Sequence, residues 1–367
     1  MNNEKVREPF VHITRRASIS KPRAWGIRLL AIVIALVICG LVIFAMTRMN
    51  PVKVYGTMWE GAFGSARKSW NTIRDAMFLL CIGVGLAPAF KMRFWNIGAE
   101  GQVLCGGIVT AAWMIYFGNT MNSTLLLIVM GISSIIAGAI WGLIPALFKA
   151  KWGTNETLFT LMMNYIAIGI VAWLQGGPWE GKPGSQIIPM FDKKAVLPKL
   201  FGVHCGWVIV LLLVAFMFVY MNYTKHGYEI AVLGESENTA KYAGMNILKV
   251  TVRTAALSGA ICGLVGFMTA SGVNQTLQSG VAGGVGFTAI TVCWLAQLNP
   301  FAMVAISFLL AVLSKGASGL QTTLSIPASI SDIITGIILL CMLGCEFFIN
   351  YRLIFRDKQA KNGKEAA

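Results

Sequence analysis

The residues best suited to chemistry in this sequence are polar side chains placed where a membrane segment is expected. Three of them lie close together: Asn96, Glu100 and Gln102. They stand between apolar runs at about 71–90 and 103–117, with Gly98 and Gly101 among them. A carboxylate at membrane depth costs about 2.5–3.5 kcal/mol on insertion scales, so it normally faces protein or water and indicates a functional site.

Two interpretations of this cluster remain open. In the first, a helix begins at Asn96, a good N-cap, and offers its free N–H groups and positive end to a polar solute inside the membrane. The three polar residues would then line a pathway. In the second, Asn96 only caps the helix, and Glu100 only reaches the membrane interface beside Lys91 and Arg93.

Two later stretches add candidates for the same pathway. Asn155 can cap a further apolar segment. Asn164, about two and a half turns on, either faces the pathway or bonds a neighbouring helix, and the second is favoured. Phe287 and Thr288 follow the glycines of 283–286, which indicate either a broken helix or a tight entry into one.

The composition predicts an all-α membrane protein. Hydrophobic residues make up 56% of the 367 residues and charged residues only 12%, well below the roughly 25% of soluble globules. A bilayer core about 30 Å thick needs about 20 apolar residues per helix. The apolar runs predict about ten transmembrane helices, at about 29–47, 71–91, 96–117, 123–148, 155–175, 206–222, 251–272, 284–298, 300–319 and 330–350.

The basic residues predict the orientation. The net charge is +15, and most lysines and arginines lie in an arm at 1–28, a tail at 352–367 and alternate loops. Because such residues flank membrane helices on the cytoplasmic side, we expect both termini in the cytoplasm and one transmembrane domain at 29–351. Five helices per half would require inverted repeats if the halves are structural repeats.

The motifs of soluble enzymes are missing from the sequence. The glycine-rich stretch 176–183 approaches a phosphate-binding loop but lacks the Ser or Thr after its lysine. The eight cysteines are scattered with no CxxC pair, and the three histidines lie far apart. We therefore expect no catalytic group, no metal site and no cofactor in this chain.

The longest loop on the expected cytoplasmic side, about 227–249, contains the pattern of a short helix. Ser236 or Asn238 can cap its start, and Gly244 can end it. Two turns of helix are unstable alone in water, so we expect a partner surface to hold this one. Tyr242 offers the largest area for a central anchor.

With these motifs the sequence resembles the permease subunits of bacterial ATP-binding-cassette (ABC) importers, in the branch for simple sugars and nucleosides. The resemblance covers about 77–351. It is carried by N-I-G-A-E-G-Q at 96–102, N-E with N-Y at 155–156 and 164–165, the loop 234–244, L-S-G-A-x-x-G-L-x-G at 257–266 and G-x-G-F-T-A-I at 284–290. Ser236 and Thr239 replace the usual Asn and Ala of the loop, and Gln297 stands where the family usually has glycine.

The resemblance implies a ten-helix permease of the vitamin-B12-importer-like type II, in a bacterial plasma membrane. Two permease subunits, of the same or different chains, would pair with an ABC ATPase subunit that hydrolyses ATP. An extracytoplasmic lipoprotein would deliver the substrate, and no nucleic acid would be involved. The loop would be the coupling helix that docks on the ATPase, with Gly234, Glu235, Glu237, Ala240, Tyr242, Ala243 and Gly244 as its candidate contacts.

The expected substrate is a nucleoside or a related small solute. This version of the 96–102 motif is most similar to importers served by basic-membrane-protein-type lipoproteins, which mostly carry nucleosides. The alternatives are the same importer carrying a simple sugar or riboflavin, and a proton-coupled secondary transporter in which Glu100 or Asp332 titrates. If Glu100 only orients helices, Glu100→Gln should keep much of the transport.

Overall fold

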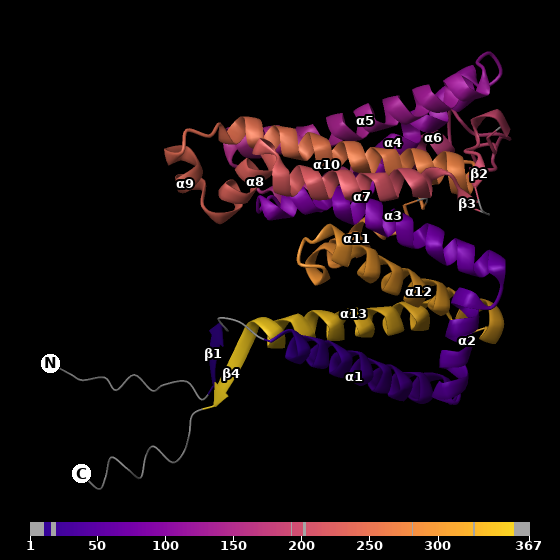
Figure 1. Ribbon diagram of the computed structural model, residues 1–367. Helices are drawn as coiled ribbons and strands as arrows, with labels where there is room; N and C mark the ends of the chain where they lie inside the picture. The colour runs from indigo at the N-terminus through magenta and orange to yellow at the C-terminus, as the bar shows by residue number, and fades with distance from the viewer. Residues whose placement is uncertain are drawn as a thin grey trace, which may run out of the picture. The chain divides into compact units, whose positions relative to one another are not determined.

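The computed structural model describes residues 11–15, 20–191, 193–200, 203–280, 282–325 and 327–355. Its chain divides into two compact units, one formed by Met1–Met58 with Ala317–Ala367 and the other by Trp59–Gly316. The helices and strands carry the labels of Figure 1.

The first unit joins the two ends of the chain. Helix α1 (Lys21–Thr47) packs against α13 (Ala328–Asn350). Next to them, strand β1 (Val11–Arg15) pairs antiparallel with β4 (Tyr351–Phe355). The chain bends by 106° between α1 and α2 (Pro51–Phe63), which carries it into the second unit. Neither the strand pair nor α2 is predicted by apolar runs, because these segments are short and contain charged residues.

The second unit contains the remaining helices. They are α3 (Ala66–Lys91), α4 (Ala99–Phe117), α5 (Ser123–Trp152), α6 (Glu156–Gln175), α7 (Gly206–Tyr223), α8 (Lys225–Glu235), α9 (Glu237–Tyr242), α10 (Ile247–Thr269), α11 (Val285–Leu295) and α12 (Pro300–Leu324), which ends in the first unit. The connections hold the 3-10 turn η1 (Lys193–Ala195), the strand pair β2 (Lys199–Leu200) and β3 (Val203–His204), and the π-turn η2 (Ala270–Asn274).

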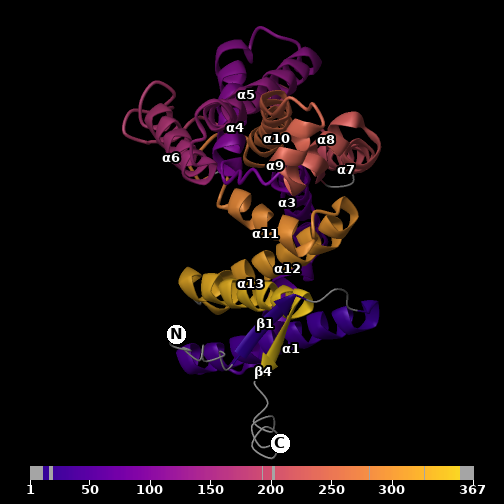
Figure 2. The ribbon, with the colours of Figure 1, turned by 90° about the vertical axis from the view of Figure 1, so that its left-hand side faces the viewer.

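Helix α10 is the centre of the second unit. It packs against α3, α4 and α5, and it lies among them in the turned view of Figure 2. Helices α8 and α9 lie at one end of α10, and the β2–β3 pair lies at the other (Figure 1). The 227–249 loop and the β2–β3 pair that precedes α7 are therefore at opposite ends of the same bundle.

Six helices in the described part of the chain are long and apolar enough to cross a membrane: α3, α5, α6, α7, α10 with η2, and α12. The number becomes seven if α1 and α2 form one broken span. The chain is thus mostly helical with the spans of a multi-pass membrane protein, and ten crossings stay a prediction. Several predicted boundaries differ from the structure. The helix expected from 29 begins at Lys21, the one expected from 71 begins at Ala66, and the one expected to end at 319 ends at Leu324. Smaller differences of three residues occur at the start of α4 and the end of α11.

Glycines bring α5 and α10 into backbone contact, as the four-residue spacing of Gly138/Gly142 and Gly259/Gly263 predicts. A Cβ atom on Gly138 would lie 2.6 Å from Gly263 Cα, and one on Gly259 would collide with the Gly138 carbonyl oxygen. Ser134 Oγ adds a hydrogen bond of 2.5 Å to the Gly263 carbonyl oxygen. The close approach fixes α5 against the central helix.

We predict that Gly259→Val destabilises the folded chain by at least about 3 kcal/mol, because overpacking costs about 1–3 kcal/mol or more and here the obstacle is backbone that cannot rotate away. The control is Gly169→Val on α6, where nothing lies within 4 Å of the added Cβ. Thermal unfolding in detergent measures both. Equal melting temperatures for the two variants would contradict the close contact between α5 and α10.

Candidate functional site

The seven residues between α3 and α4 form a tight connection held by its own backbone. Phe94 N donates to the Ala89 carbonyl oxygen over 2.9 Å, and Arg93 has a φ of 61°. Gly98 occupies the N-cap position of α4, so the prediction that Asn96 caps this helix is wrong. Instead, Asn96 Oδ1 accepts the Gly98 N–H over 3.0 Å two residues before the helix. The amide therefore shapes the turn that leads into α4.

The side chain of Asn96 also joins the connection to the central helix. Its Nδ2 donates to Ser258 Oγ on α10 over 3.2 Å and lies 3.4 Å from Gln102 Oε1. Gln102 Nε2 in turn donates to Asn96 Oδ1 over 3.3 Å. Both amides are 1% exposed. Their hydrogen bonds tie the start of α4 to α10 in a buried polar cluster.

Helix α6 holds the same connection from the other side. Asn164 Oδ1 accepts the Gly101 N–H over 2.8 Å, and its Nδ2 donates to the Ile97 carbonyl oxygen over 2.9 Å. Thr160 Oγ1 accepts the Ile97 N–H over 3.1 Å. The side chain of Asn164 is 2% exposed and satisfies two backbone groups at the entry to α4. This is the geometry of the favoured interpretation, in which Asn164 bonds a neighbouring helix.

Asn155 caps α6 as predicted, since its Oδ1 accepts the Leu158 N–H over 3.1 Å. Glu156 follows in the first turn and pairs with Lys149 at the end of α5 over 2.8 Å. The positive end of the helix also stabilises a carboxylate in this position. The cap and the ion pair position Thr160 and Asn164 on the buried face of α6.

Glu100 binds the start of α11, nearly 190 residues away in the chain. Its Oε1 accepts the Gly284 N–H over 2.7 Å, and its Oε2 accepts the Gly286 N–H over 2.9 Å. The side chain is buried, at 5% exposure, and does not reach the interface beside Lys91 and Arg93. A carboxylate at a helix N-terminus accepts hydrogen bonds from backbone N–H groups that have no carbonyl acceptor within the helix.

The glycines of this contact leave room for the carboxylate. A Cβ atom on Gly286 would lie 2.8 Å from Glu100 Oε2 and 2.7 Å from Glu100 N, so a side chain would displace the contact. Gly284 has a φ of 77°, a conformation that L-residues rarely adopt. Gly284 is the N-cap residue of α11. The glycine-rich stretch is thus a tight entry into α11 that Glu100 stabilises, in agreement with the second of its two interpretations.

The two residues that follow Gly286 differ in the exposure of their side chains. Phe287 is 43% exposed, whereas Thr288 is partly buried and its hydroxyl donates back to the Gly284 carbonyl oxygen over 3.3 Å. Farther along α11, the Trp294 ring stacks on Trp95 with centroids 5.3 Å apart. Phe287 is therefore the most exposed of the candidate pathway residues. Glu100 holds the backbone next to it, whereas Asn96, Gln102 and Asn164 form hydrogen bonds around the start of α4.

The predicted short helix of the 227–249 loop is α9. Ser236 caps it, accepting the Thr239 N–H over 3.2 Å, and Gly244 ends it with a φ of 73°. Tyr242 is 93% exposed and Ala243 is also exposed, whereas Ala240 is buried at 1%. The buried Ala240 thus packs α9 against the rest of the chain, and the side chain of Tyr242 projects from its outer surface.

The acidic residues of α9 and α8 lie around this surface. Glu237 pairs with Lys241 one turn later over 2.7 Å, with both side chains largely exposed. Glu235 ends α8 and lines a shallow pocket together with Ser236 and Lys149. An exposed pair of this kind contributes little stability by itself, so its position on the exposed side of α9 is the more informative property.

Helix α8 connects this surface to the buried polar cluster. A Cβ atom on Gly234 would collide with the Lys91 carbonyl oxygen, which shows that α8 lies against the last turn of α3. Lys91 directly precedes the connection that contains Asn96. A shift of α9 and α8 would therefore press on the backbone that Asn96 and Asn164 hold.

Sequence reasoning missed Thr160 and Ser258 as members of the polar cluster. Thr160 lies one turn before Asn164 on the same face of α6, a spacing that could have suggested it. Ser258 lies within the 257–266 motif, but nothing local indicates that its hydroxyl meets Asn96. Both residues are almost fully buried.

The arrangement is that of a polytopic membrane protein in which buried polar side chains hold the starts of α4 and α11, with the short exposed helix α9 at one end of the bundle. The chain belongs to the family described as branched-chain amino acid transport system / permease component, which matches residues 70–343. This membership confirms the resemblance drawn from the motifs. It also makes the protein a transporter permease component.

Several transporter permeases are similar to this chain over most of its length. The glucose ABC transporter permease of Haloferax volcanii is 29% identical over 344 residues, covering 90% of each chain. The guanosine ABC transporter permease NupP of Bacillus subtilis is 29% identical, covering 85% of this chain and 91% of its own. The nucleoside ABC transporter permease NupB of Lactococcus lactis is 26% identical, covering 91% and 94%. No solved structure matches the chain.

We predict that Glu100→Gln weakens the start of α11 without abolishing transport. The amide oxygen can accept one of the two N–H groups, but the NH₂ group would face the other donor. Hydrogen bonds to charged groups contribute about 1.5–3 kcal/mol, so the loss should be of that order. Thermal unfolding measures it, with Glu60→Gln, an exposed glutamate of α2, as the control.

Transport by the same variant separates the two roles of Glu100. A structural role predicts that uptake persists with its pH dependence unchanged. Complete loss of uptake, together with loss of its pH dependence and normal assembly, would identify Glu100 as a proton-coupling group instead.

Proposed function

We propose that the protein is the permease subunit of an ATP-driven ABC importer and forms the translocation pathway for a nucleoside or a related small solute. The single observation that carries the proposal is the continuous contact from the exposed helix α9 through Gly234 and Lys91 to the buried cluster of Asn96. A transporter that hydrolysed ATP itself would need a nucleotide site in this chain. A permease driven by a separate ATPase subunit needs a surface that the ATPase can move. It also needs contacts that carry this movement to the transport pathway.

Helix α9 is the proposed coupling helix. It has only six residues, and a helix of this length depends on its surroundings. The cap at Ser236 and the buried Ala240 fix it to the chain, which leaves Tyr242 directed outward. An aromatic anchor with a charged rim is the usual composition of a helix that docks into a groove. The groove would belong to a separate ATPase subunit.

The proposed response inside the membrane is a shift at the start of α11. The connection between α3 and α4 contains Asn96, which bonds α10. It leads directly into the first turn of α4, which contains Glu100. Glu100 in turn holds Gly284 and Gly286. Movement at α8 would thus alter the position of Phe287 and the access of a solute to it. Helix N-termini inside a membrane commonly line transport pathways near the midplane.

The membrane topology is proposed as ten crossings of the type II permease, with both termini in the cytoplasm of a bacterial plasma membrane. The antiparallel pair of β1 and β4 supports termini on one side, since the two strands bond each other. Basic residues next to α8, α9 and α10 support a cytoplasmic position for that end. A second permease subunit and an extracytoplasmic binding lipoprotein would complete the importer.

The substrate proposal depends on the relatives. The Bacillus and Lactococcus permeases are named for guanosine and nucleosides, which supports a nucleoside as cargo. The Haloferax permease is named for glucose and is equally similar to the chain, so a simple sugar is the second candidate. Uptake of radiolabelled guanosine and glucose by vesicles with the ATPase and binding protein decides between them. ATP-independent uptake of either would reject the ABC importer.

We predict that Tyr242→Ala lowers the affinity of the ATPase subunit about thirtyfold or uncouples hydrolysis from uptake. Truncation of a central anchor commonly costs 2 kcal/mol or more. Glu235→Ala should do less, because water and salt screen a rim charge. Co-purification and substrate-stimulated ATPase activity of the reconstituted complex measure both effects.

The control for this experiment is Tyr223→Ala, which removes another highly exposed tyrosine, at the end of α7. Its complex should assemble and hydrolyse ATP normally. Normal assembly, hydrolysis and uptake with Tyr242→Ala would reject Tyr242 as the anchor. The same result after replacing all of 235–243 by glycine and serine would reject α9 as the docking element.

A further inference from the structure

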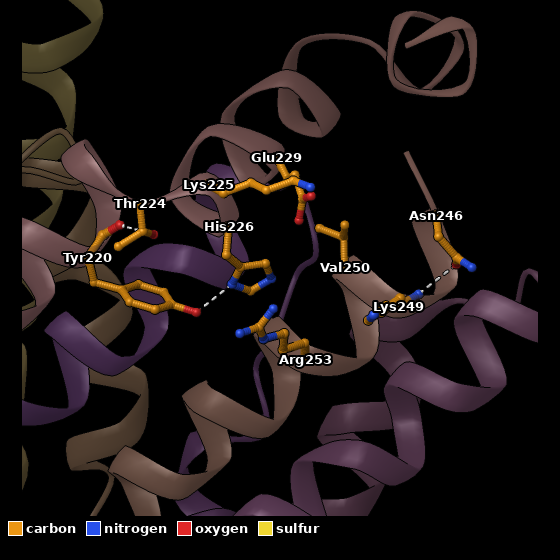
Figure 3. Close-up of a pocket in the computed structure, with 9 residues that line it drawn as sticks. All are labelled: Tyr220, Thr224, Lys225, His226, Glu229, Asn246, Lys249, Val250 and Arg253. Atoms are coloured by element: carbon orange, nitrogen blue, oxygen red, sulfur yellow. Dashed lines mark hydrogen bonds between the residues drawn. The ribbon is translucent and has the colours of Figure 1, made fainter. Parts of the chain in front are cut away.

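A pocket of about 340 Å³ lies where α7, α8 and α10 meet, outside the polar cluster and outside α9. Figure 3 shows that its walls come from the end of α7, the first turns of α8 and the first turns of α10. A volume of this size lies at the lower end of the range for small-molecule sites. The proposed transport pathway gives it no role.

The lining is strongly basic. Lys225, Lys249 and Arg253 line the pocket, and Glu229 is the one carboxylate among the lining residues, which leaves a net charge of +2. Within the described part of the chain, Lys249 and Arg253 have no carboxylate oxygen within 4.0 Å. Cations without a partner in a concave site attract an anion.

The backbone adds to this positive potential. Helix α8 begins after Thr224, whose hydroxyl accepts the Gly227 N–H over 3.1 Å, and α10 begins after Asn246, whose Oδ1 accepts the Lys249 N–H over 3.0 Å. Thr224 and Asn246 both line the pocket, so the positive ends of two helices lie at the same cavity as the three cations.

A neutral histidine holds the wall of the pocket in place. His226 Nδ1 lies 2.5 Å from the Tyr220 hydroxyl, and its Nε2 lies 3.4 Å from Thr254 Oγ1. Burial, assisted by the nearby Arg253 guanidinium, lowers the pKa of His226 from its usual 6.5, so the ring is uncharged at neutral pH. It joins α7, α8 and α10, while the three longer side chains supply the charge.

The pocket lies at the height where the membrane surface is expected. Helix α7 is an apolar span that ends at Tyr223, and Lys225 follows two residues later. Tyr223 is 75% exposed, and its ring packs edge-on against Phe218, with centroids 6.2 Å apart. Tyrosines exposed at the end of a span mark the headgroup region of a bilayer. A soluble anion would not require the site to lie at this depth.

We propose that this pocket binds the phosphate headgroup of an anionic phospholipid. The phosphate would lie between Lys249 and Arg253, one helical turn apart on α10, with Lys225 closing the site from α8. Basic pockets between helices on the cytoplasmic side are known to suit such headgroups, because the cytoplasmic leaflet carries the anionic lipid. The bound lipid would hold α8 against α10 and so position the helix that precedes α9.

The test is a titration of the full-length chain in neutral detergent with dioctanoyl phosphatidylglycerol. Binding is measured as the shift in the melting temperature of the chain. Each juxtamembrane cation is worth about fivefold in affinity, so the double variant Lys249→Gln/Arg253→Gln should bind roughly 25-fold more weakly. The matched control is Lys151→Gln/Lys241→Gln, two cations at the same end of the bundle that do not line the pocket. Its affinity should stay within about twofold of the unmodified chain.

A second variant covers the case in which the double variant does not fold. Glu229→Gln removes the carboxylate of the pocket and should raise the affinity for phosphatidylglycerol about fivefold. Unchanged or weaker binding by this variant would overturn the proposal. Equal loss of binding by the Lys151/Lys241 control would also overturn it, because the attraction would then follow total charge and not this site.

Two further ligands separate the source of the phosphate. Dioctanoyl phosphatidylcholine should cause no saturable shift over the same concentrations, because its headgroup is neutral overall. Glycerol 3-phosphate and inorganic phosphate should compete only at concentrations at least a hundredfold higher. If either competes as well as the lipid, the site takes a soluble phosphate and the lipid assignment is wrong.

Discussion

The second unit depends on one requirement: a helix that begins away from water must have acceptors for its first backbone N–H groups. In lipid no water is available to accept these hydrogen bonds, and each unsatisfied group costs several kcal/mol. The carboxylate of Glu100 satisfies two such groups, those of Gly284 and Gly286. The cost of burying that charge is thereby offset by the positive end of α11. The buried carboxylate of Glu100 and the N–H groups at the start of α11 would each be unstable without the other. The start of α4 and the start of α11 must therefore lie together.

The same requirement explains why two helices, α6 and α10, bond the region around the connection between α3 and α4. Thr160 and Asn164 of α6 bond the backbone of Ile97 and the N–H of Gly101 in the first turn of α4, while Asn96 bonds α10. A connection held from two sides cannot move without moving α6 or α10. It can therefore transmit a displacement from α8 instead of absorbing it, as the proposed coupling through α9 requires.

Features encoded within a few residues could be predicted from the sequence. The apolar runs predict most helix positions, and the caps at Asn155 and Ser236 follow from residue type and spacing. The partners of Glu100 could not be predicted, because its carboxylate meets amides 184 and 186 residues away. The pairing of β1 with β4 was missed for the same reason, since each strand forms only against a segment at the other end of the chain.

The exit from α11 shows how a departure from the family pattern has a physical consequence. Gln297 stands where the family usually has glycine, and it adopts a φ of 51°, followed by Leu298 at 59°. The left-handed conformation costs roughly 1–2 kcal/mol for a residue with a Cβ atom, a cost that glycine avoids. The turn is kept because the Leu298 N–H bonds the Cys293 carbonyl oxygen over 3.0 Å and α12 begins directly after it. The backbone geometry of this exit is therefore stabilised by the helices on either side, and a glycine at 297 would lower its conformational cost.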